Sequence, residues 1–130
     1  MSFHRKVALI YAVALFGAAA INYIPGLTDP DGLAFGVFAL DIFDDLLHLA
    51  SGLWALVAAL VSARAARNFL VIFGALYLAD GLMGLAVGSG YLDLGIVNNG
   101  VLDLPFTFKI MANAPHVGLG GFALWAGLRR

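Results

Sequence analysis

Four apolar stretches, each long enough to cross a membrane as a helix, limit what this chain can fold into. They cover residues 7–24, 46–63, 69–87 and 110–128. About 18 residues at roughly 1.5 Å rise per residue cover about 27 Å, which is close to the hydrocarbon thickness of a bilayer. Inside lipid every backbone polar group needs a partner within the protein, and no stretch shows the alternation of a membrane β-strand. We therefore expect four transmembrane α-helices.

The composition agrees with a membrane protein and argues against several function classes. Hydrophobic residues make up 62% of the 130 residues and charged residues only 12%, whereas a soluble domain carries roughly 25% charged residues. The seven Lys and Arg residues are too few for a nucleic-acid-binding surface. No cysteine is present, so disulfides and thiolate metal sites are excluded. The length of the chain predicts one membrane domain, residues 1–130. Because no hydrolase, phosphate-loop or dinucleotide motif occurs, we expect that the protein is not an enzyme.

The charged residues predict the orientation of the chain in the membrane. By the positive-inside rule, both termini and the short loop at 62–68 are expected to be cytoplasmic, because they carry nearly all Lys and Arg residues. The longer loops on the other side carry most of the acidic residues. An alternative is that the first stretch is a signal peptide, since basic residues precede it and small residues end it. The basic residues on the predicted cytoplasmic side are Arg5, Lys6, Arg64, Arg67, Arg129 and Arg130.

Two segments of the chain repeat the same short pattern. In each, a histidine is followed by a glycine four residues later, by an aromatic residue six residues later and then by Ala-Leu. These residues are His48 with Gly52 in the second stretch, and His116 with Gly120 in the fourth. The repeat predicts an integral membrane four-helix bundle made of two two-helix repeats, with the histidines at matched depth and apolar outer loops capping the mouth.

The paired histidines allow three interpretations. The first is structural, with each histidine bonded to a neighbouring outer loop. The second is a bis-histidine site for haem b, in which Gly52 and Gly120 leave room for the macrocycle one helical turn below His48 and His116. The third is a metal-binding or proton-transfer role. We expect no cofactor, with haem b as the alternative, and the sequence names no metal.

Asp80 is the one acidic residue well inside an apolar stretch. An ionisable group at this depth is costly unless it is paired, neutralised or hydrated, so it is a candidate functional residue. Expected partners at similar depth are Asn22 and Tyr23, as buried polar residues at the end of the first helix, or His48. The open interpretations are a protonated carboxyl group that bonds two helices, a proton or cation site, and a contact between subunits.

Other polar residues near the outer side are expected to cap helices. Asp44 or Asp45 is the expected N-cap of the second helix, because short acidic side chains accept bonds from free backbone N–H groups. The alternative is that these two residues and Asp41 bind a divalent cation. Asn113 is the expected N-cap of the fourth helix, with Pro115 in its first turn.

Several short motifs resemble those of a known family. They are Ile-Pro-Gly-Leu-Thr at 24–28, Gly-Val-Phe at 36–38, Gly-Ala-Leu-Tyr at 74–77, and the two histidines with their glycines. The chain resembles the domain of unknown function 4383 family of small bacterial four-span membrane proteins. The resemblance implies a topology, without an established activity or cofactor.

The function expected from these features is a structural or accessory role in a bacterial inner or cell membrane. Such a protein has the lipid bilayer as its surroundings and packs against itself as a homo-oligomer or against a larger membrane complex, with no nucleic acid as partner. Ligand or cofactor binding at the outer mouth is the first alternative. A minimal proton or ion pathway through Asp80 is the second.

Overall fold

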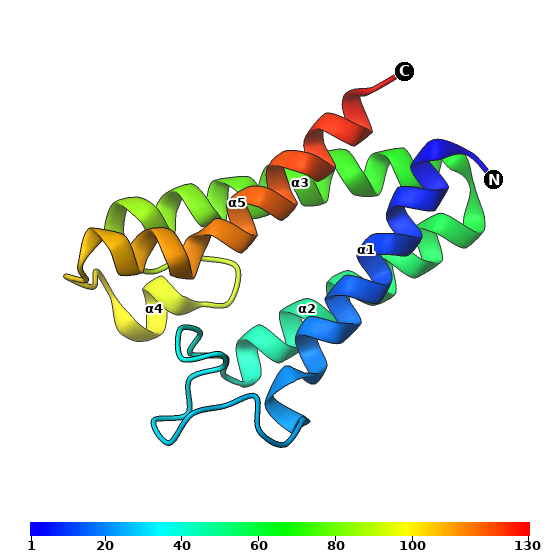
Figure 1. The fold of residues 1–130 in the computed structure, drawn as a ribbon. Helices are drawn as coiled ribbons and strands as arrows, with labels where there is room; N and C mark the ends of the chain where they lie inside the picture. Colours follow the sequence, from blue (N-terminus) through cyan, green and yellow to red (C-terminus); the bar gives the residue numbers. More distant parts are fainter.

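The computed structural model describes residues 1–130 and is all-α, as the sequence predicts (Figure 1). The four long helices are α1 (Phe3–Ala20), α2 (Ile42–Val61), α3 (Ala63–Val87) and α5 (Phe106–Leu128). A 3-10 turn, η1 (Ile21–Tyr23), follows α1, and a short helix, α4 (Gly95–Asn99), lies between α3 and α5. The β-structure consists of two isolated bridges in the loop between η1 and α2, Thr28 with Ala34 and Ala34 with Phe38.

The long helices pack mainly as two antiparallel pairs, α1 with α2 and α3 with α5. Both chain ends and the α2–α3 connection lie at one end of the molecule, and the two long loops lie at the other (Figure 1). We call these the terminal end and the loop end. Because residues far apart in the sequence meet at the loop end, any site there must combine several elements.

Aromatic side chains fill the interior between the helix pairs. Phe69, Phe73 and Tyr77 of α3 are at most 2% exposed. Their rings follow one another, with centroids 4.9 Å apart for Phe69 and Phe73 and 4.0 Å apart for Phe73 and Tyr77. Tyr11 of α1 packs edge-on against Phe73 at 5.4 Å. This stack leaves the middle of the molecule closely packed.

Glycines bring α3 and α5 into close contact. A Cβ on Gly74 would collide with the backbone of Leu124, and one on Gly120 would collide with the backbone of Leu78. Small residues that allow such an approach are typical of helix interfaces in membranes, where packing replaces hydrophobic driving force. The α3–α5 pair therefore depends on these positions remaining glycine.

At the terminal end, arginines bind the free carbonyl groups of neighbouring helices. Arg5 of α1 donates from Nε to the Ala59 carbonyl at 2.6 Å, and Arg67 of α3 donates to the Gly127 carbonyl at 2.9 Å. The last carbonyls of a helix lack intrahelical partners, and a cation at this end also interacts favourably with the helix dipole. Each helix pair is thus joined at its terminal end in the same way.

The expected loop at 62–68 is wrong, because one residue makes this connection. Ser62 has extended backbone at φ −168° and ends α2, and its hydroxyl accepts the Ala65 N–H at 3.0 Å. A serine that satisfies a first-turn donor starts a helix at once. Helix α3 therefore begins at Ala63.

The expected helix caps also need correction. The N-cap of α2 is Asp41, whose carboxylate accepts the Asp44 N–H at 3.0 Å, while the Asp44 carboxylate accepts the Asp41 N–H at 3.2 Å. This reciprocal capping box starts α2 at Ile42 and leaves Asp45 within the first turn. Asn113 caps nothing, because α5 already begins after Pro105, and its side chain donates to the Lys109 carbonyl.

Three helical segments are long and apolar enough to cross a membrane: Phe3–Tyr23, Ile42–Val61 and Ala63–Val87. Many of their large apolar side chains are exposed, such as Val13 at 74% and Val57 at 56%. A lipid-facing surface has this character, whereas a soluble protein seldom exposes so much apolar surface. Helix α5 is as long, but Asn113 and His116 lower its apolar character, and its role as a fourth span stays a prediction.

Candidate functional site

The loop end encloses a cavity of about 430 Å³, which we call the chamber. Its walls come from the end of α1, the loop residues 37–40, the first turns of α2, the segment 88–95 with α4, and the first half of α5. Both long loops therefore contribute to its lining, as expected for loops that cap the mouth. Its polar lining residues are Asp44, His48, Asp80, Ser89, Asp93, Asn99, Asn113 and His116.

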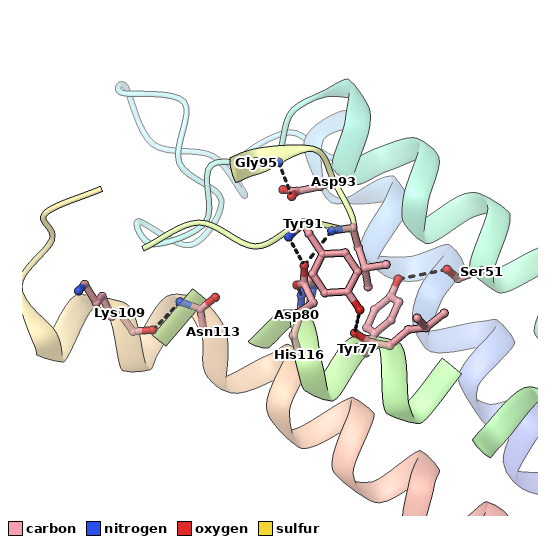
Figure 2. Close-up of polar contacts among 11 residues, drawn as sticks. Ser51, Tyr77, Asp80, Tyr91, Asp93, Gly95, Lys109, Asn113 and His116 are labelled. Carbon is pink, nitrogen blue, oxygen red and sulfur yellow. Dashed lines mark hydrogen bonds and ion pairs between the residues drawn. The ribbon is translucent and has the colours of Figure 1, made fainter. Parts of the chain in front are cut away.

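Asp80 joins three elements at the floor of the chamber (Figure 2). It is 3% exposed, and its Oδ1 accepts the backbone N–H groups of Tyr91 at 2.9 Å and Leu92 at 3.0 Å. Its Oδ2 lies 2.5 Å from Nδ1 of His116 on α5. A carboxylate that receives several N–H groups is stabilised in its charged form. This arrangement therefore favours the ionised Asp80 carboxylate over the protonated donor that the sequence led us to expect.

The loop folds onto Asp80 because Gly90 lets its backbone approach. A Cβ on Gly90 would collide with the Asp80 carboxylate. The next residue, Tyr91, donates its hydroxyl to the Leu76 carbonyl at 2.8 Å. Partial burial and the nearby Asp80 carboxylate raise the pKa of the Tyr91 phenol, so it stays a donor at neutral pH. Sequence analysis missed Gly90 and Tyr91, because neither carries a motif.

The structure brings the two predicted histidines together. The rings of His48 and His116 meet edge to face with centroids 6.0 Å apart. His116 reaches the outer loop through Asp80, in line with the structural interpretation. His48 differs, since it is 5% exposed and its Nδ1 has no hydrogen-bond partner.

The glycine argument for haem is wrong. The space beside Gly52 is filled by the Phe16 ring of α1, 2.9 Å from an added Cβ, and the space beside Gly120 is filled by the Leu78 backbone. Each glycine brings two helices of one pair together and leaves no room for a macrocycle. The haem alternative therefore loses the space that the two glycines were expected to provide.

Asn22 and Tyr23 do not meet Asp80, and neither is buried. Tyr23 is 71% exposed, and its hydroxyl donates to Asp45 Oδ2 at 3.3 Å. The Asn22 amide donates to the Leu40 carbonyl and, at 3.5 Å, to the same Asp45 oxygen. These residues lie after α1 has ended, so they hold the first loop onto α2. The partner of Asp80 is His116, which the sequence analysis did not pair with it.

Two further carboxyl groups line the chamber, those of Asp44 on α2 and Asp93 in the second loop. We call these two residues the carboxyl pair. Asp93 also accepts the Gly95 N–H through Oδ1 at 2.9 Å, which fixes it at the start of α4.

Ser89, 6% exposed, has a hydroxyl without a partner. Sequence analysis missed Asp93 and Ser89, and the polar residues of the long second loop were the available signal.

The acidic and imidazole groups do not form a metal site, since no three of them are arranged to hold an ion. The expected cluster of Asp41, Asp44 and Asp45 is divided as well. Asp41 and Asp44 cap α2, while Asp45 turns toward Tyr23.

Comparison with known families places this arrangement in context. The family model described as Domain of unknown function (DUF4383) matches residues 5–104. The chain belongs to this family. The DUF4383 match covers α1 to α4, and it ends before α5 with His116 and Gly120. No curated protein and no solved structure matches the chain.

Proposed function

We propose that this DUF4383 protein is an accessory membrane protein that holds a small ligand in the chamber at its loop end. The observation that carries the proposal is a cavity of about 430 Å³ lined by His48 and Ser89, whose Nδ1 and Oγ atoms are buried without hydrogen-bond partners. Buried polar groups in native proteins are nearly always hydrogen-bonded, so each exception needs a reason such as a functional role. The volume is in the range of small-molecule sites.

An ion pathway through Asp80 is less well supported than binding. The side chains directly toward the terminal end, Tyr77, Phe73 and Phe69, are at most 2% exposed and stack on one another. A conducted ion needs a chain of polar groups or water across the membrane. The aromatic stack supports a chamber that is open at one end only.

The proposal includes a four-span topology with two repeats and cytoplasmic termini. Matched contacts support the repeats. Arg5 binds the Ala59 carbonyl and Arg67 binds the Gly127 carbonyl. Ala59 follows His48 in the sequence by the same number of residues as Gly127 follows His116. The basic terminal end supports the orientation in a bacterial inner or cell membrane. Reporter fusions after Asp31 and at Arg130 should then report opposite sides, and the same side for both would refute the topology.

The structural role expected from the sequence, packing against a larger complex or a second copy, remains compatible with this proposal. The exposed apolar side chains suit either lipid or a membrane partner. No catalytic activity is proposed, since no nucleophile with an adjacent base is part of the chamber lining.

The chamber can be tested by cysteine accessibility, because the chain has no cysteine of its own. Ala112 lines the chamber, whereas Ala123 is 0% exposed in the core. In intact cells, Ala112→Cys should react with a small membrane-impermeant thiol reagent, and Ala123→Cys should not. The proposal fails if Ala112→Cys is unreactive from outside although the exposed lining position Ala39→Cys reacts.

A further inference from the structure

The charge of the chamber lining is one-sided. Three carboxyl groups line it, those of Asp44, Asp80 and Asp93, and no Lys or Arg does. Asp80 is already occupied by two backbone N–H groups and His116. The Asp44 and Asp93 carboxylates, in contrast, each accept one backbone N–H group, from Asp41 and Gly95 respectively, and both residues line the cavity. A low-dielectric chamber of this kind attracts cations and repels anions.

The groups without partners lie in the same lining. His48 and Ser89 are 5% and 6% exposed, and neither His48 Nδ1 nor Ser89 Oγ has a hydrogen-bond partner. Both atoms can accept a hydrogen bond from a ligand. Together with the carboxyl pair they make a set of acceptors contributed by α2 and by the second loop. The chemical complement is a group with several N–H donors and a positive charge.

Apolar side chains make up much of the remaining lining. It includes Phe38 and Leu40 of the first loop, Leu102 and Leu104 of the second, and Phe108 and Leu119 of α5. A fully hydrated inorganic ion would leave these side chains without contacts. A ligand with a hydrocarbon body would bury them.

We propose that the chamber binds a small organic cation, a primary ammonium group attached to a short apolar body. The ammonium donates to the Asp44 and Asp93 carboxylates and to Ser89 or His48. The apolar body packs against Phe38, Phe108 and Leu119. This inference rests on the proposed function and specifies its ligand class.

The experiment uses hexylammonium as the probe on the full-length Ala112→Cys protein in vesicles. The measured quantity is the rate at which a neutral thiol reagent labels the cysteine. Hexanol and hexanoate, which share the hydrocarbon body, replace the charge with a hydroxyl and a carboxylate. Hexylammonium should protect the cysteine at a concentration about tenfold lower than hexanol, as one added charge-assisted bond predicts. Hexanoate should give no protection.

A matched pair of variants separates specific binding from general attraction to an acidic protein. Asp93→Asn keeps an acceptor for the Gly95 N–H and removes the charge, so it should fold and lose the preference for hexylammonium. Asp103 does not line the chamber and is exposed, so Asp103→Asn should keep the preference. Equal loss in both variants would overturn the assignment to the carboxyl pair.

The possible failures are distinct. If Ala112→Cys reacts but hexanol protects as well as hexylammonium, the chamber exists and binds an apolar ligand, so the cation inference is wrong. Better protection by hexanoate, or protection by none of the three probes, refutes the inference in the same way. If Ala112→Cys is unreactive from outside while the exposed Ala39→Cys reacts, the proposed function itself fails.

Discussion

Replacement of Asp80 tests whether this carboxylate holds the second loop on the helices. In Asp80→Leu, two backbone N–H groups and His116 Nδ1 lose their acceptor. A buried donor without a partner costs about 1–3 kcal/mol. Tyr91, Leu92 and His116 are half-buried, so water can reach their N–H groups in part. Each of these three unpaired donors should therefore cost about 1 kcal/mol, the lower end of that range. The free energy of unfolding should therefore fall by about 3 kcal/mol.

Asp80→Asn should cost much less. The amide oxygen can still accept from Tyr91 and Leu92, and the amide NH₂ can donate to His116 in the tautomer with a free Nδ1. What is lost is the charge assistance, which amounts to about 1 kcal/mol for such a network. The two variants should thus differ by about 2 kcal/mol although both remove the negative charge.

The assay is unfolding by denaturing detergent in mixed micelles, combined with hydrogen exchange of individual amides. In Asp80→Leu the amides of Tyr91 and Leu92 should exchange much faster. The Ala66 amide, which donates to the Ser62 carbonyl at 3.0 Å at the terminal end of α3, should stay protected and serves as the internal control. Equal stability of Asp80→Leu and the wild type, or unchanged exchange of the Tyr91 and Leu92 amides, would refute the reasoning.

Two further predictions use matched variants. Gly120→Ala should lower the free energy of unfolding by about 1–3 kcal/mol because its Cβ meets the α3 backbone. Gly118→Ala, two residues away with open space around it, should be neutral or gain up to about 1 kcal/mol, and similar losses for both would contradict the packing argument. Arg67→Ala should cost about 1 kcal/mol through the lost bond to the α5 carbonyl. Arg64→Ala, which breaks no such bond, is the control in the same unfolding measurement, and an equal effect would point to general charge loss.

The helices were predictable because their apolar length leaves few alternatives, but their ends were not. Asp44 and Asp45 look like the polar edge of an apolar run, yet both are buried within α2. Their burial follows from the capping box with Asp41 and from contacts with the loops, which a reading of apolar runs does not detect. Ser62 likewise compresses an expected loop to one residue, because its side chain caps the next helix directly.

The site was predictable only in part, for a related reason. The repeated pattern was enough to predict that His48 and His116 lie near each other, since it places them at matched depth on two helices. The partner of Asp80 depends on how α3 is aligned with α5, and that alignment is set by Gly74 and Gly120 meeting backbone. Those glycines are too common in apolar helices to show an alignment by themselves. The carboxyl pair depends on a loop fold that no local pattern specifies.

The proposed repeat also indicates where the two halves diverge. At the terminal end they match, with Arg5 and Arg67 each bound to a carbonyl of the partner helix. At the loop end, the residue at the same separation from the arginine is Ala18 in the first half and Asp80 in the second, and both line the chamber. The Asp80 carboxylate accepts backbone N–H groups of the second loop, which the Ala18 methyl group cannot do. The second loop therefore folds inward, and Ser89 and Asp93 come to line the chamber. The polar groups of the second loop therefore line the chamber because Asp80 in the second half replaces Ala18 in the first. The arginine contacts that the two halves share hold each helix pair together at the terminal end.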